Sequence, residues 1–106
     1  MHVTLTRAST SDAPLEYATM VGTELNRWLA DIEGFEGFLM LSRPGESIGL
    51  SFWASAEIAE EHRVSRRQFV ERLTGVAGVQ IEEMVDYALT FANLGSLQVA
   101  EPPGDA

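Results

Sequence analysis

A turn between two apolar runs constrains this chain more than any other feature. The runs are residues 35–41, Phe-Glu-Gly-Phe-Leu-Met-Leu, and residues 48–53, Ile-Gly-Leu-Ser-Phe-Trp. Between them lie Pro44 and Gly45, and because proline presets one turn dihedral while glycine tolerates a positive one, the chain should reverse there. Ser55 follows the second run and is a good helix cap. The sequence therefore predicts a β-hairpin that passes directly into a helix.

Helical spacing flanks this hairpin on both sides. Residues 13–32 and residues 56–73 place apolar side chains every three or four positions, which is typical of amphipathic helices. Residues 2–8 and 81–91 alternate apolar and polar side chains, as half-buried strands do. The order strand, helix, strand, strand, helix, strand predicts a ferredoxin-like α+β fold, in which a four-stranded antiparallel sheet carries two helices on one face.

The second face of this sheet is also expected to be apolar. The second hairpin strand carries Ile48, Leu50 and Phe52 on one side and Trp53 on the other. A monomer would leave one of these sides bare, and soluble proteins rarely expose so large an apolar surface. We therefore predict a homodimer packed sheet to sheet, as in a dimeric α+β barrel.

The chain is expected to form one domain, residues 1–94, followed by a C-terminal tail, residues 95–106. No apolar run approaches the roughly 20 residues of a spanning helix, and the N-terminus lacks a signal-peptide layout. We therefore expect no membrane contact and a cytoplasmic location. Sixteen acidic against seven basic residues give a net charge of −9, which repels phosphate backbones. We expect no nucleic-acid partner, although RNA-recognition domains share this element order.

Metal and thiol chemistry are not expected either. The chain has no cysteine, which excludes disulfides, thiolate nucleophiles and zinc–thiolate sites. The glutamates at positions 57, 60 and 61 have no converging histidines, so they indicate a favourable helix N-terminus and no metal site. No phosphate-binding loop, nucleophile elbow or dinucleotide fingerprint is present.

Two short motifs in the hairpin indicate a family. Gly-Phe-Glu-Gly-Phe at 34–38 leads into the first strand, and Ser-Phe-Trp-Ala-Ser at 51–55 closes the second. With the acidic helix start and the aromatic-ended last strand, residues 2–92 resemble the antibiotic biosynthesis monooxygenase-like family of dimeric α+β barrel proteins. The resemblance implies a ligand pocket between sheet and helices in each protomer. For some members it implies oxygenation of a phenolic or quinol-like substrate without flavin, haem or metal, so we expect no cofactor.

The family's functional residues are only partly present in this chain. Trp53 matches the tryptophan that ends the third strand of the family, and Arg72 approximately matches a helical arginine. Gly49 and Ala59 stand where the aromatic-polyketide oxygenases have an asparagine and a tyrosine. Haem-degrading relatives use an asparagine and a histidine that this chain also lacks. Two functions therefore stay open: a cofactor-independent monooxygenase acting on an aromatic polyketide- or quinol-like molecule, and a non-catalytic dimeric module that binds a small ligand or assembles.

The candidate site combines a base, an aromatic wall and cations. Helical spacing turns His62 toward the sheet, where its imidazole would be the catalytic base that takes a phenolic proton. Arg66 follows one turn later and, with Arg72, would hold the resulting anion, while Trp53 would line the pocket. Each of these residues also has a structural alternative, as a buried histidine, a core tryptophan or a solvated arginine. His2 is expected at the surface.

Overall fold

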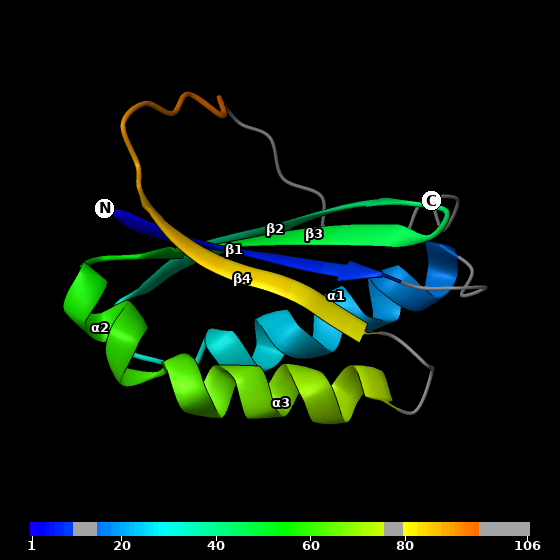
Figure 1. Cartoon of the computed structure of the whole chain (residues 1–106). Coiled ribbons are helices and arrows are strands. Elements are labelled where there is room, and N and C mark those ends of the chain that lie inside the picture. The colour runs from blue at the N-terminus through cyan, green and yellow to red at the C-terminus, as the bar shows by residue number, and fades with distance from the viewer. Residues whose placement is uncertain (10–14, 76–79, 96–106) are drawn as a thin grey trace.

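The structure is a computed structural model that describes residues 1–9, 15–75 and 80–95 (Figure 1). The predicted tail therefore lies outside the described residues from position 96 onward. The elements, in chain order, are β1 His2–Ser9, α1 Leu15–Leu29, β2 Phe35–Arg43, β3 Glu46–Trp53, α2 Ala56–Glu61, α3 Arg63–Gly75 and β4 Gln80–Ala88.

The strands form one antiparallel sheet in the order β2-β3-β1-β4. In Figure 1, α1 and α3 lie side by side against one face of the sheet, and α2 lies at the end where β3 stops and β1 starts. This arrangement confirms the predicted ferredoxin-like α+β fold. None of the described helices is long and apolar enough to cross a membrane.

The predicted hairpin is confirmed, and two glycines shape its ends. Pro44 and Gly45 form the turn between β2 and β3, and Gly45 has a φ of +90°, which an L side chain rarely adopts. Gly34 has a φ of +93° before β2, and a β-carbon there would lie only 2.5 Å from Cδ1 of Ile58. Its missing side chain therefore lets α2 pack closely on the start of the hairpin. Ser55 caps α2 as predicted, because its hydroxyl accepts the Ile58 N–H at 3.2 Å.

The predicted helix boundaries need correction. The first helix ends at Leu29 and not at residue 32, and turn hydrogen bonds carry the chain from there to β2. Its expected start at residue 13 lies outside the described residues. The expected single helix over 56–73 is two helices, because His62 has a φ of −102° and a ψ of 7° between α2 and α3. No proline or glycine marks this break, so the helical spacing runs across it undisturbed.

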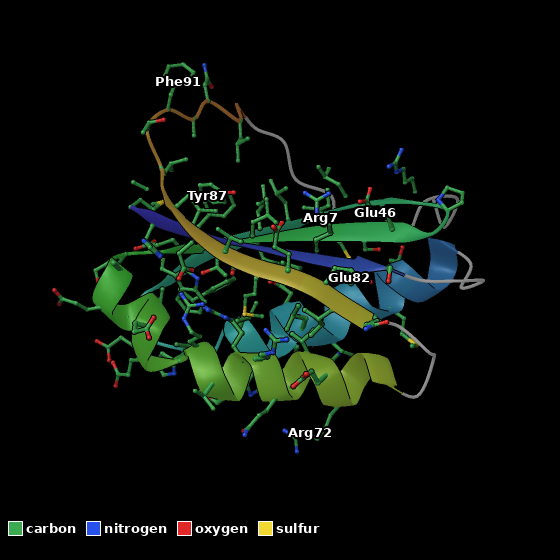
Figure 2. All side chains as sticks on the ribbon, viewed as in Figure 1. Arg7, Glu46, Arg72, Glu82, Tyr87 and Phe91 are labelled. Atoms are coloured by element: carbon green, nitrogen blue, oxygen red, sulfur yellow. The ribbon has the colours of Figure 1, made fainter. Side chains whose placement is uncertain are left out.

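The last strand is shorter than predicted. β4 was expected to reach Phe91, but it ends at Ala88, which lies opposite His2 in β1. The Leu89 N–H still bonds to the Met1 carbonyl at 2.9 Å. Beyond Leu89 the alternation of apolar and polar residues continues to Phe91, but the structure has no strand there. Phe91 is 84% exposed and points away from the sheet in Figure 2.

The two faces of the sheet differ in cover. On the helix-facing side, Trp53 of β3 forms the core with residues of the three helices: Leu25 and Leu29 of α1, Ala59 of α2 and Val70 of α3. The opposite face has no covering element among the described residues, and strand alternation brings these apolar side chains to it: Val3, Leu5, Leu39, Leu41, Ile48, Leu50, Phe52, Val85 and Tyr87. Leu41 and Tyr87 are more than half exposed. Arg7 and Glu46 form an ion pair on this same face (Figure 2).

Candidate functional site

Trp53 lies at the centre of the candidate site. It is the last residue of β3, pairs across the sheet with His2 and Phe35, and turns its indole toward the helices. The side chain has no exposed surface and contacts the Phe35 ring edge-on, with centroids 5.7 Å apart. Its Nε1 donates to the Ser51 hydroxyl at 3.3 Å. The indole is therefore a core residue whose own polar group already has a partner.

Arg66 of α3 lies over this indole. Its guanidinium carbon is 5.0 Å from the ring centroid, a cation–π distance, and the residue is only 3% exposed. The atoms Nε, Nη1 and Nη2 are all shielded from solvent and have no hydrogen-bond partner in the described part of the chain. Buried polar groups in proteins are nearly always paired, since an unpaired buried charge is costly. The guanidinium is thus an unsatisfied donor group in the interior.

The surroundings of Arg66 act on its proton affinity. Burial, followed by the charge of the nearby Arg63, lowers the pKa of Arg66 to about 10, and Glu60 acts in the opposite direction. At neutral pH the group is still a cation. The lowered pKa is consistent with a charge that has lost its hydration without gaining a carboxylate.

His62 contacts the same indole. Its ring is stacked on Trp53 with centroids 6.4 Å apart and an interplanar angle of 14°. The break between α2 and α3 places this side chain at the end of α2, and its carbonyl accepts the Arg66 N–H at 2.9 Å, one turn into α3. The structure therefore brings together three of the four predicted site residues, around one aromatic ring.

Arg72 is not part of this group. It is exposed on the far half of α3, and Figure 2 shows its side chain pointing away from the sheet. With Gln68 and Glu71 it borders a shallow hollow on the outer surface of the helix.

An acidic residue that the sequence interpretation passed over lies beside the site. Asp86 of β4 accepts the Thr4 hydroxyl at 2.7 Å, forms an ion pair with Nη2 of Arg63, and lies 3.5 Å from Nε2 of His2. His2 is partly buried, contrary to its expected surface position. Strand alternation puts Asp86 on the same side as Met84, but only the ion pair with Arg63 of α3 shows that this side faces the helices.

Arg63 and Arg66, one turn apart on α3, differ in whether they have carboxylate partners. Arg63 has two carboxylates, since its Nε donates to Glu60 at 2.8 Å and its Nη2 meets Asp86. Arg66, three residues later, has none among the described residues. Among the described residues, Arg66 is therefore the arginine of the site whose guanidinium has no hydrogen-bond partner. Among the described residues, no three histidine or acidic side chains come together as a possible metal site.

The chain shares its fold with solved structures of one group of proteins. SnoaB from Streptomyces nogalater, a cofactor-independent oxygenase, aligns with a TM-score of 0.66 over 89% of this chain and 97% of its own, at 13% identity. A candidate antibiotic biosynthesis monooxygenase from Deinococcus radiodurans gives 0.65 over 88% and 96%, at 15% identity. A similarly named protein from Nitrosomonas europaea gives 0.58 over 86% and 100%, at 17% identity.

No family model matches the chain, and no curated protein matches its sequence. At such low identities the structural likeness shows a common fold and does not show a common activity. The predicted resemblance to antibiotic biosynthesis monooxygenases is confirmed at the level of fold.

Proposed function

We propose that this protein is a cofactor-independent monooxygenase that acts on an electron-rich aromatic molecule, of the quinol or aromatic polyketide type. The observation that carries the proposal is the buried guanidinium of Arg66, which has no described hydrogen-bond partner and shares the Trp53 indole with the His62 imidazole. A base and a cation beside one aromatic ring suit a reaction that begins with loss of a phenolic proton.

In this reaction each residue has a separate role. His62 accepts the proton of the substrate, and the positive charge of Arg66 stabilises the resulting anion. The electron-rich anion then reduces dioxygen, so that one oxygen atom enters the carbon skeleton and the other leaves as water. Trp53 holds Arg66 in position from the core side, because the indole is fully covered. Arg72 lies outside this group and takes no part in the proposed step.

The proposal includes a homodimer formed through the open face of the sheet, and a cytoplasmic location as expected from the sequence. The apolar side chains on that face, with Leu41 and Tyr87 more than half exposed, support the sheet-to-sheet arrangement. Light scattering at micromolar concentration should give the mass of two chains. A stable monomer would remove the sheet-to-sheet model.

Oxygen consumption tests the proposed reaction. The wild-type protein is incubated with a panel of anthrones and hydroquinones, with no added cofactor, beside His62→Ala and the control Arg72→Gln. We expect turnover with at least one substrate, a loss of about 100-fold or more in His62→Ala, and no loss in Arg72→Gln. Equal rates in wild type and His62→Ala would show that the mechanism is wrong. If panel compounds bind but none of them is turned over, the non-catalytic ligand-binding module is favoured.

A further inference from the structure

The planar arrangement of the N–H donors of Arg66 indicates the shape of its ligand, whereas its charge indicates only that the ligand is an anion. A guanidinium has five N–H donors in one plane, and two of its nitrogens can donate in parallel to a pair of coplanar oxygens. In Arg66 all three nitrogens are shielded from solvent and unpaired among the described residues. One phenolate oxygen would leave most of these donors without an acceptor.

The two carboxylates beside Arg63 are already engaged. Glu60 and Asp86 both pair with Arg63, and Asp86 also accepts the Thr4 hydroxyl. The Trp53 ring lies against the guanidinium on the core side and offers only its π-face. Within the described part of the chain, no oxygen pair is therefore placed to satisfy Arg66.

We propose that the ligand of this site carries a planar carboxylate on an aromatic ring, and that Arg66 binds the two carboxylate oxygens side by side. The inference rests on the proposed function for the aromatic part of the ligand, but it concerns binding and not oxygenation. The carboxylate approaches next to His62, the partly exposed member of the group around Trp53. It supplies the paired acceptors that Arg66 lacks among the described residues.

Calorimetric titration with three matched probes tests this inference. The probes are 2-naphthoate, its uncharged amide 2-naphthamide, and 2-naphthol, which presents a single oxygen. We expect wild-type protein to bind 2-naphthoate at least about tenfold more tightly than the other two, since charge-assisted bidentate hydrogen bonds are the stronger ones. Equal binding of naphthoate and naphthamide, or tighter binding of naphthol, would overturn the inference.

Substitutions separate the charge of Arg66 from its shape. Arg66→Lys keeps the charge and loses the paired donors, so 2-naphthoate affinity should fall about tenfold. Arg66→Met should abolish the preference for naphthoate. Arg67→Gln is the matched control, because Arg67 is the next residue, is exposed, and pairs only with Glu71 among the described residues. Full naphthoate affinity in Arg66→Lys would contradict side-by-side binding, and circular dichroism of each variant verifies the fold.

The same titration distinguishes the inference from the proposed function. Oxygenation that depends on His62, without naphthoate binding, would leave the proposed function standing and remove the carboxylate. Naphthoate binding that depends on Arg66, without turnover of any substrate, would do the reverse.

Discussion

The two tryptophans of this protein are covered by residues of α3 that lie only three positions apart, yet their surroundings differ in kind. Trp28 of α1 is stacked on Phe69, with ring centroids 4.8 Å apart and an interplanar angle of 7°. Trp53 is covered by Arg66, a charged group without a described hydrogen-bond partner. The first pair is ordinary core packing, in which both partners gain by burial. In the Trp53–Arg66 pair a buried charge without a hydrogen-bond partner costs free energy. Such a cost is expected of a residue that binds a ligand and not of one that only fills the core.

The largest expected effect is loss of the ordinary pair. Phe69→Ala removes the ring stacked on Trp28 and should lower the free energy of unfolding by about 3 kcal/mol, since it removes buried apolar area and leaves a cavity. Urea unfolding measures the change. Val64→Ala, at an exposed position of the same helix, is the control and should change stability by less than about 0.5 kcal/mol. A loss as small as the control's would show that the two tryptophans are not different in the way described.

Asp86→Asn should have the next largest effect. The substitution removes the carboxylate that pairs with Arg63 and accepts the Thr4 hydroxyl, so a partly buried arginine loses a counter-ion. We expect a loss of about 2 kcal/mol, below the value for a fully buried pair because both partners are partly exposed. Glu71→Gln, which breaks the exposed pair with Arg67, should cost about 0.5 kcal/mol or less. Equal losses in the two variants would argue against a special environment around Asp86.

Arg66→Met should stabilise the protein, in contrast to the two substitutions above. An apolar side chain of similar length avoids the cost of burying an unpaired charge, so the free protein should gain about 1 to 2 kcal/mol in unfolding free energy. Thermal and urea unfolding of both proteins, without ligand, give the difference. Destabilisation would indicate instead that the contact of Arg66 with Trp53 holds the fold together and that the residue is structural.

The smallest expected effect is a pH dependence of the difference in unfolding free energy between wild type and Arg66→Met. Burial lowers the pKa of Arg66 to about 10 in the folded protein, below its ordinary value, so the folded state binds fewer protons than the unfolded state from about pH 10 upward. The wild type should therefore gain stability relative to Arg66→Met as the pH rises through 10, by at most about 1.4 kcal/mol per pH unit. Urea unfolding at pH 8, 10 and 11 measures the gap. A gap that stays constant would show that the arginine is not desolvated.

Local signals were enough to predict the elements but not all of their ends. The Pro44-Gly45 turn and the Ser55 cap depend on adjacent residues, and both are confirmed. The end of β4 depends on its pairing with β1, since Ala88 lies opposite His2 and the Leu89 N–H bonds to the Met1 carbonyl. The break at His62 carries no glycine or proline, so nothing local revealed it.

The sequence predicted which side chains lie near one another in the site, but not which of them have hydrogen-bond partners. Helical spacing brought His62 and Arg66 to the indole of Trp53, as the structure has them. That spacing does not reveal whether an arginine will find a carboxylate, since this depends on tertiary contacts. Here the carboxylate of Asp86, on β4, forms its ion pair with Arg63 and not with Arg66. The absence of a described partner for Arg66 could be recognised only once the side chains of Arg63, Arg66 and Asp86 were placed.

The anchoring of Arg66 within α3 also affects how a ligand is bound. A free arginine side chain loses rotamer entropy when it is immobilised by a ligand, at a cost of about 0.5 to 1.5 kcal/mol. Arg66 is already held between the helix and the Trp53 ring, with 3% of its surface exposed. Folding has therefore ordered this group before any ligand arrives, and a bound anion meets a preorganised partner.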